Sequence, residues 1–336
     1  MDVLLFAFLV ATAVWGVSRL RDLFAATMML SLFSLLSAGL FMVMDAVDVA
    51  FTEASVGAGI STVLLLSTLS LTHRREKRRE RRLDPAALVL VFAVGALLLW
   101  GSQDMPAYGD PQAPVHTYMV PRFLEQSGEE VGPPNIVTSV LASYRGYDTF
   151  GEATVVFTAA VGALLLLTGL RRRGEADSRE PGGDEQGVRM RGNVILRVAI
   201  RPMIPFILMF ALYVQFHGDY GPGGGFQAGV IFAAGVILAA LIWGLHRVRE
   251  VFTPRALELL IAGGILLYGS VGVVAMVRGG NFLDYDTLAH DPVHGQHLGI
   301  LLVELGVGIT VASVMIALFL LFAGRGRRSP SAVESG

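Results

Sequence analysis

The sequence has no cysteine and only one lysine, Lys77, among its 336 residues. Without cysteine, the chain cannot form disulfides, thiolate metal sites or iron–sulfur ligation, and it has no cysteine nucleophile. Charge is also scarce: 16% of the residues are charged, 53% are hydrophobic, and the mean hydropathy is +0.59. This composition is too apolar for an ordinary soluble domain, and the apolar residues fall in blocks, so we expect a membrane protein.

Nine apolar blocks are candidates to cross a bilayer, because a span needs about 20 mostly apolar residues. The expected spans are 3–18, 23–44, 49–71, 86–101, 147–170, 195–216, 224–245, 256–277 and 298–322. The first lacks the positive flank of a signal peptide, so we expect it to be retained as a helix. The sequence therefore predicts an all-α, polytopic membrane fold with about nine transmembrane helices.

The basic residues test this count, because Lys and Arg concentrate in short loops on the cytoplasmic side. If the N-terminus lies outside, 23 of the 26 Lys and Arg fall on the inner side. Only Arg122, Arg145 and Arg278 then face outward. We therefore expect the N-terminus outside and the C-terminus in the cytoplasm, since adding or removing one helix would scramble this separation.

The loops divide the chain into two membrane regions. Residues 174–192 are rich in Gly, Asp and Glu without apolar periodicity, which predicts a flexible cytoplasmic linker. The linker separates a five-helix region, 1–173, from a four-helix region, 193–324, which a cytoplasmic tail, 325–336, follows. The basic run 73–84 could bind nucleic acid, but its place at the end of a span favours membrane lipid headgroups.

The fourth and fifth blocks are joined by a long outer connection. Residues 102–134 contain six prolines, which predicts an extended or turn-rich segment. Residues 135–144 place Ile136, Val137, Val140 and Leu141 on one helical face. We expect a short amphipathic helix there, lying on the outer surface.

Acidic residues inside the apolar blocks are functional candidates, because a carboxylate is costly in a bilayer. Glu53 lies about one turn into the third block, with Thr52 beside it and Asp48 at the outer edge. Glu152 lies near the outer end of the fifth block, and Glu304 lies about 10 Å into the ninth. Small residues near Glu53 and Glu304 suggest close helix packing, and a buried carboxyl can exchange a proton or bind a cation.

Structural roles are the alternative to an ion path for these acidic residues. Asp48 and Asp148 could cap helices or lie among the headgroups. Glu152 could pair with Arg145 at the surface. Glu53 and Glu304 are harder to explain in these ways, so they are the stronger candidates for an ion path.

A glycine-rich turn joins the sixth and seventh blocks. Its residues are His217, Gly218, Asp219, Tyr220, Gly221, Pro222, Gly223, Gly224, Gly225, Phe226, Gln227, Ala228 and Gly229. Proline and three consecutive glycines allow a sharp turn that packs against other backbone. A phosphate loop is excluded, because the Gly-Lys-Ser/Thr that would complete it is missing. The turn is either a tight helix connection that needs glycine or a gate, where His217 and Asp219 guard an ion entrance.

Three histidines lie in the last outer loop. His290, His294 and His297, beside Asp291, have spacings that could bind a metal, although loop histidines without a fixed scaffold seldom do so. A surface that collects protons is the alternative. We expect no resident metal or cofactor, and transported Na⁺ and H⁺ as the ions.

Several motifs resemble one family. The Pro-Gly-Gly-Gly-Phe core at 222–226 resembles the first helix–turn–helix of the B-type subunit of Mrp-type multisubunit Na⁺/H⁺ antiporters, and Glu304 with the glycines after it fits the last helix of the same protein. Ala50-Phe51-Thr52-Glu53-Ala54 resembles the C-terminal part of the large A-type subunit of these antiporters, and is similar to small subunits of energy-converting membrane-bound hydrogenases. Residues 145–152, Arg-Gly-Tyr-Asp-Thr-Phe-Gly-Glu, resemble the next piece of the A-type subunit.

The resemblance implies a fused protein, in which the tail of the A-type subunit is joined to the B-type subunit, within an assembly related to respiratory complex I. It places the protein in a prokaryotic cell membrane, makes Glu53 and Glu152 part of a proton or sodium path, and makes the turn a structural or gating element. No span contains lysine, so the lysine–glutamate pairs of the antiporter-like bundle are not encoded here. Large antiporter-like partner subunits must supply them.

We therefore predict a transporter subunit that is not an enzyme and does not bind nucleic acid. Asp48, Thr52 and Glu53 would bind Na⁺ or H⁺ alternately, and Glu152 and Glu304 would pass ions toward the outer side. One alternative is a purely structural connector, and another is a membrane subunit of a redox-driven pump of the hydrogenase or complex I type. A stand-alone carrier is disfavoured, because the five and four unlike helices show no internal repeat.

Overall fold

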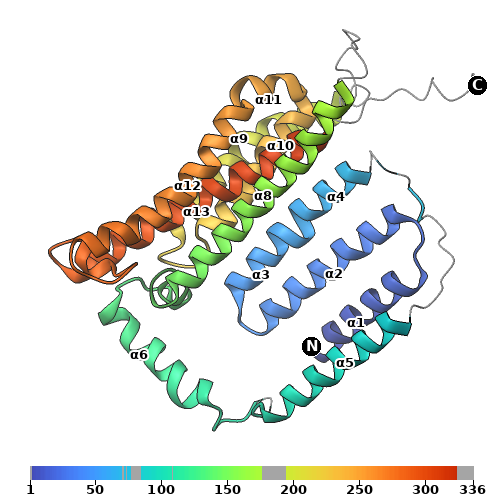
Figure 1. Cartoon of the computed structure of the whole chain (residues 1–336). Helices are drawn as coiled ribbons and strands as arrows, with labels where there is room; N and C mark the ends of the chain where they lie inside the picture. Colours follow the sequence, from blue (N-terminus) through green and yellow to red (C-terminus); the bar gives the residue numbers. More distant parts are fainter. Residues whose placement is uncertain are drawn as a thin grey trace, which may run out of the picture.

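The computed structural model describes residues 2–69, 72, 74–76, 85–107, 109–175 and 194–323. The linker expected at 174–192, the tail at 325–336 and most of the basic run at 73–84 lie outside these residues, although Gly174 and Glu175 still belong to a helix. Within the described ranges the chain is helical and contains no β-strand, so the all-α prediction is confirmed (Figure 1).

Each of the nine expected blocks forms a helix or a continuous helical segment. The N-terminal region contains α1 (Asp2–Arg19), α2 (Leu23–Val43), α3 (Val47–Glu53), η1 (Ala54–Ser61), α4 (Thr62–Leu69), α5 (Pro85–Gly101) and α8 (Gly146–Glu175). The C-terminal region contains α9 (Val194–His217), α10 (Gly225–Trp243), α11 (Leu245–Val251), α12 (Pro254–Val277) and α13 (Pro292–Ala323). Eight helical segments are long and apolar enough to cross a membrane, with Val47–Leu69 (α3, η1 and α4) counted as one. The apolar part of α1, Leu4–Gly16, is shorter. The chain is a multi-pass membrane protein.

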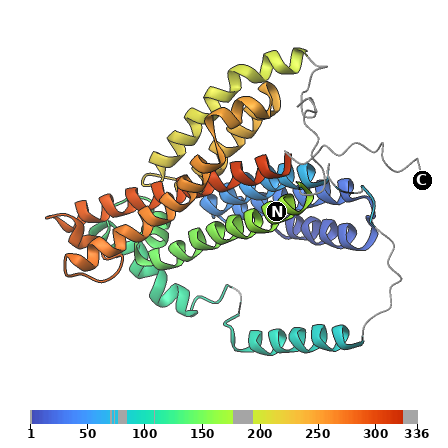
Figure 2. The same cartoon turned by 45° about the horizontal axis from the view of Figure 1, so that its top comes forward.

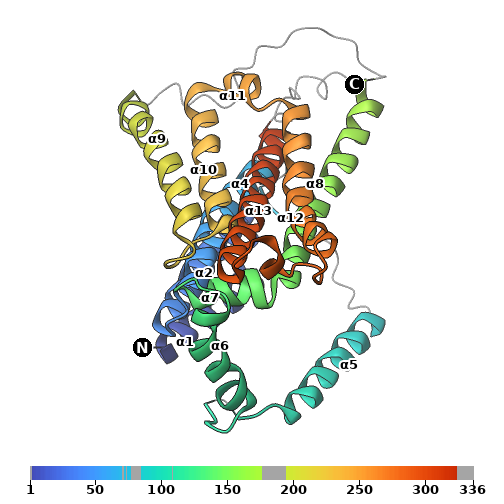
Figure 3. The ribbon, with the colours of Figure 1, turned by 90° about the vertical axis from the view of Figure 1, so that its left-hand side faces the viewer.

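Helix α13 is the centre of the bundle and packs against α10, α12, α8 and α4 (Figure 3). Glycines allow these close contacts, because helix backbones can touch only where side chains are small. A Cβ atom on Gly306 would lie 2.7 Å from the carbonyl oxygen of Gly264 on α12. A Cβ atom on Gly229 of α10 would lie 2.7 Å from the carbonyl oxygen of Gly308. The short spacing of glycines along α13 therefore fixes where α10 and α12 cross it.

The first helices form a smaller layer beside this bundle. Helix α2 packs against α1 and against the segment α3–η1–α4, which in turn contacts α10 and α13. The middle of that segment, η1, is a π-helix, a geometry often found at functional sites. Helix α5 has no buried residue and stands apart from the bundle (Figure 2).

The outer connection is more helical than predicted. Two π-helical turns, η3 (Val115–Met119) and η4 (Ser139–Tyr144), a 3-10 turn, η2 (Ser102–Asp104), and two α-helices, α6 (Val120–Glu130) and α7 (Ile136–Thr138), lie between α5 and α8. The prediction of an extended segment was wrong for α6. Its only proline, Pro121, lies in the first helical turn, where a missing N–H costs no hydrogen bond.

The short helix expected at 135–144 is present as α7 and η4, but it buries an unexpected face. Thr138, Ser139 and Ala142 are buried, whereas the apolar Val137 and Leu141 are exposed. The small polar face packs against the protein because Thr138 donates a hydrogen bond to the glycine-rich turn.

Candidate functional site

The glycine-rich turn between α9 and α10 requires glycine for two reasons. Gly224 has φ +114°, in the region that L side chains rarely adopt. A Cβ atom on Gly223 would lie 2.7 Å from a backbone carbonyl oxygen of α9, and one on Gly225 would overlap the backbone carbonyl of Glu304. The turn therefore packs closely against the backbones of α9 and α13, as its glycine content predicts.

Residues of the N-terminal region hold this turn from the other side. The N–H of Gly223 donates to Asp48 Oδ1 at 3.1 Å. Asn135 Nδ2 and Thr138 Oγ1 both donate to the carbonyl oxygen of Gly218, at 3.0 and 2.7 Å. The two regions of the chain thus meet at this turn, through polar contacts that would be costly to leave unmade in a buried position.

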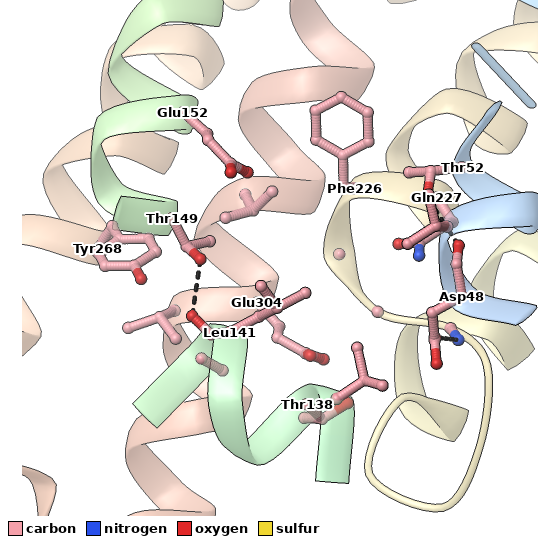
Figure 4. Close-up of a pocket in the computed structure, with 18 residues that line it drawn as sticks. Asp48, Thr52, Thr138, Leu141, Thr149, Glu152, Phe226, Gln227, Tyr268 and Glu304 are labelled. Carbon is pink, nitrogen blue, oxygen red and sulfur yellow. Dashed lines mark hydrogen bonds between the residues drawn. The ribbon is translucent and has the colours of Figure 1, made fainter. Parts of the chain in front are cut away.

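A cavity of about 230 Å³ lies beside the turn (Figure 4). Four of the five predicted ion-path residues line it: Asp48, Thr52, Glu152 and Glu304. They come from α3, α8 and α13, and in Figure 4 Glu304 lies between Asp48 and Glu152. Phe226 also lines the cavity.

The electrostatics of the cavity favour cations. Its lining includes three carboxylates and no Lys, Arg or His. Among the residues that the structure describes, neither Glu152 nor Glu304 has a hydrogen-bond or ion-pair partner. Glu152 is exposed, but it does not pair with Arg145, because the guanidinium of Arg145 pairs with Asp148 instead. Like charges around one space repel each other unless a proton or a cation joins them.

Glu304 is held against the backbone of the turn. Its two carboxylate oxygens lie 3.1 Å from the points that Cβ atoms on Gly218 and Gly224 would occupy. Helix α10 begins at Gly225, directly beside this carboxylate. A helix N-terminus carries a partial positive charge, so it stabilises a negative group placed there. Glu304 thus lies against the turn and also lines the cavity.

Asp48 and Thr52 share one face of α3. They are four residues apart, and the Thr52 hydroxyl donates to the backbone carbonyl of Asp48 at 2.7 Å. The alternative in which Asp48 caps its helix is wrong, because Ala46 is the N-cap of α3. The Asp48 carboxylate reaches across to the turn instead.

Glu53 does not line the cavity. It is five residues from Asp48, a rotation of about 140° around a regular helix, so the two side chains point in different directions. A Cβ atom on Gly57 would lie 2.6 Å from Glu53 Oε1 and 2.5 Å from Ser34 Oγ. Glu53 therefore faces its own next turn and α2, and its role in an ion path stays a prediction.

We expect Gly57→Ala to disturb Glu53 directly. The added methyl group overlaps Glu53 and Ser34, so one of them must move, and we expect a loss of stability of about 1–3 kcal/mol. The thermal stability of the purified complex measures this. Gly39→Ala is the matched control in α2, where a Cβ atom meets nothing within 4 Å. Equal stability of the two variants would show that Glu53 is not packed where the structure places it.

The two turn residues proposed as guards lie outside the cavity lining. The His217 ring stacks on Tyr213 with 4.8 Å between centroids. Asp219 Oδ2 pairs with His297 Nδ1 at 2.9 Å. Burial raises the pKa of Asp219 above its ordinary value, while His297 acts in the opposite direction. Pro222 is exposed at the tip of the turn.

The structure does not bring the three histidines of the last outer loop together. His294 pairs with Asp291 at 2.7 Å and His297 pairs with Asp219, so the histidines turn to different partners. Among the described residues, no three His, Cys, Asp or Glu side chains gather in a way that could hold a metal ion. His290 joins no such group.

Two buried tyrosines fix the wall of the cavity. Tyr268 lines it, and its hydroxyl donates to the carbonyl oxygen of Gly146 at 2.7 Å. The hydroxyl of Tyr285 donates to the carbonyl oxygen of Ala142 at 3.0 Å. Burial raises the pKa of Tyr285, which keeps it a neutral donor. These bonds join η4 and the start of α8 to the C-terminal region.

The sequence did not identify Asn135, Thr138 or Gln227 as residues of the site. Asn135 is the N-cap of α7, with its side chain accepting from Val137 N–H, so its place before a short helix was a usable signal. Gln227 lies within the glycine motif and lines the cavity, but nothing in the motif alone indicated its direction.

Three family models match successive parts of the chain. A domain related to the MnhB subunit of Na⁺/H⁺ antiporter matches residues 195–317. The D and E subunits of MBH match residues 8–74 and 84–182.

Similar proteins include a probable K⁺/H⁺ antiporter A/B subunit from Rhizobium meliloti (strain 1021). It is 28% identical over 317 residues, which are 87% of this chain and 31% of that protein. The putative antiporter subunit mnhB2 of Staphylococcus haemolyticus (strain JCSC1435) is 33% identical over 135 residues, which are 39% of this chain and 95% of that protein. The chain thus spans about a third of the first relative and nearly all of the second.

Two solved structures share the fold. A chain of the Mrp complex from Dietzia sp. DQ12-45-1b aligns with a TM-score of 0.74 and 25% identity, covering 97% of this chain and 35% of that one. A chain of the archaeal membrane-bound sulfane sulfur reductase aligns with a TM-score of 0.50 and 28% identity, covering 69% of this chain and 94% of that one.

Proposed function

Because the chain belongs to the family of antiporter subunits related to MnhB, we propose that it is a membrane subunit of a multisubunit monovalent cation/proton antiporter. The resemblance to the B-type subunit of Mrp antiporters, fused to parts of the A-type one, agrees with these matches. The proposal places the protein in the cell membrane, with the N-terminus outside. Its partners are the other subunits of the complex, including the large antiporter-like ones.

The observation that carries this proposal is the cavity where three helices bring Asp48, Glu152 and Glu304 together. Carboxylates within a membrane mark proton and ion paths by default, because they are expensive to keep there without a role. A proton and a cation compete for the same carboxylates, so occupancy by one requires release of the other. This competition supports exchange of Na⁺, or another monovalent cation, for H⁺ within this protein.

Na⁺-dependent proton exchange in inverted vesicles containing the whole complex tests the proposal. We expect Asp48→Asn to lower exchange by roughly tenfold, because the amide keeps an acceptor for Gly223 but loses the charge. Asp45→Asn is the control, since Asp45 is exposed and lies outside the cavity lining. Normal exchange by Asp48→Asn would instead favour a structural connector.

A second candidate function is a membrane subunit of a redox-driven pump. The matches to the D and E subunits of MBH favour it for the N-terminal region, and the similarity to a chain of the sulfane sulfur reductase, over 69% of this chain, agrees with it. The proteins that copurify with this chain distinguish the two functions. Partners carrying iron–sulfur clusters would support the redox pump, and antiporter-like partners without redox centres would support the antiporter.

A further inference from the structure

Gln227 has no structural use that accounts for its burial. It is the third residue of α10, only 8% exposed, and lines the cavity. Glutamine at this position often bonds back to the N–H of the N-cap residue. Here the N–H of Gly224, the N-cap, donates to the carbonyl oxygen of Val214 at 3.1 Å instead. The side chain of Gln227 makes no hydrogen bond with any part of the chain that the structure describes.

The amide oxygen of Gln227 and the carboxylate of Glu304 both approach Gly224. Measured from the point that a Cβ atom on Gly224 would occupy, Glu304 Oε1 is 3.1 Å away and Gln227 Oε1 is 3.7 Å away. Figure 4 shows Gln227 on the same side of the cavity as Asp48 and Thr52. The Thr52 hydroxyl donates a hydrogen bond to the backbone carbonyl of Asp48, so the lone pairs of its oxygen remain available.

These groups offer a set of oxygen ligands from three helices, α3, α10 and α13. They comprise the carboxylates of Asp48 and Glu304, the hydroxyl of Thr52 and the amide of Gln227. Oxygen ligands without nitrogen or sulfur suit hard cations. A proton needs only one carboxylate, whereas a cation that sheds water needs several oxygens to replace its hydration shell.

We propose that the cavity binds a partly dehydrated monovalent cation and that the amide oxygen of Gln227 is one of its ligands. This inference rests on the proposed antiporter function and adds the residue that sets cation affinity. The carboxylates serve both the proton and the cation, and the neutral amide serves the cation alone. Loss of the amide therefore weakens cation binding more than it weakens proton binding.

The test uses Gln227→Met in the assembled complex, with Gln215→Met as the matched control. Both glutamines are more than nine-tenths buried, but Gln215, on α9, does not line the cavity, and its Nε2 has no partner in the described structure. Methionine has a similar length and no oxygen. The two measurements are the half-saturating Na⁺ concentration for exchange in inverted vesicles and equilibrium ²²Na⁺ binding to the purified complex.

We expect Gln227→Met to raise the half-saturating Na⁺ concentration and weaken ²²Na⁺ binding by about tenfold or more, with Gln215→Met unchanged. Gln227→Glu keeps an oxygen ligand and should retain Na⁺ binding. If Gln227→Met prevents assembly, Gln227→Asn, which shortens the reach of the amide by one methylene, is measured in the same way.

Values within about twofold of the wild type for Gln227→Met would overturn the inference, as would equal effects of the two methionine variants. The Glu304→Gln variant separates this failure from that of the proposed function. If Glu304→Gln exchanges normally, the ion path through this cavity is wrong altogether. If Glu304→Gln stops exchange while Gln227→Met binds Na⁺ normally, only the role of Gln227 is wrong.

Discussion

Replacing Glu304 with Gln is expected to stop cation/proton exchange while leaving the complex assembled. Glu304 lies between the carboxylates on α3 and α8, and each of its two oxygens lies 3.1 Å from the point that a Cβ atom on Gly218 or Gly224 would occupy. An amide of the same shape can fill this space, but it can neither release a proton nor neutralise a cation. We expect exchange to fall by roughly tenfold or more, because a proton relay fails when one of its carboxyls is removed.

The assay is Na⁺-dependent proton exchange in inverted vesicles, normalised to the amount of assembled complex. Glu258→Gln is the matched control, since Glu258 is exposed at the start of α12 and does not line the cavity. Glu304→Asp provides a second comparison, because it keeps the charge and shortens the side chain. Exchange at the wild-type rate in Glu304→Gln would remove Glu304 from the path and leave it as a packing residue of the turn.

Gly225→Ala is expected to prevent stable assembly, the largest structural effect that we predict. The new methyl group would overlap the backbone carbonyl of Glu304 and lie 3.0 Å from the backbone nitrogen of Gly308. Backbone atoms of a packed helix cannot turn away as a side chain can, so α10 and α13 must separate. We expect a cost of more than about 3 kcal/mol, at the upper end of overpacking effects.

The yield and thermal stability of the purified complex measure this cost. Gly263→Ala is the matched control on α12, since a Cβ atom there meets nothing within 4 Å and removal of a helical glycine favours the helix. A well-assembled Gly225→Ala complex with normal stability would contradict the close crossing of α10 and α13. Because no charge changes, this variant also separates packing of the turn from its chemistry.

The sequence could have indicated part of the cavity. Asp48 and Thr52 are four residues apart, so they lie on one face of a helix, whereas Glu53 is rotated by about 140° from Asp48. This periodicity is inconsistent with the predicted ion site in which Asp48, Thr52 and Glu53 act together. The structure places Asp48 and Thr52 at the cavity and directs Glu53 toward Ser34 and Gly57.

Other features could not be read from sequence because they depend on contacts between distant residues. Asn135 donates to the carbonyl oxygens of Gly218 and Gly221, more than eighty residues away. Together with the bond from Thr138 to Gly218, this contact turns the polar face of α7 and η4 inward, against what the apolar residues of that segment predicted. A helical periodicity shows that a segment has two faces, but the neighbouring element decides which face is buried.

The sequence alone determined the membrane helices, the need for glycine between α9 and α10, and the relationship to antiporter subunits. These follow from local properties: the length of apolar blocks, the backbone freedom of glycine and the order of short motifs. Only the tertiary structure decided that Asp48, Glu152, Glu304 and Gln227 line one cavity, and that His294 and His297 pair with different aspartates. The physical reason is that the packing of α3, α8, α10 and α13 brings these side chains together, and this packing depends on contacts between helices rather than on the pattern within any one of them.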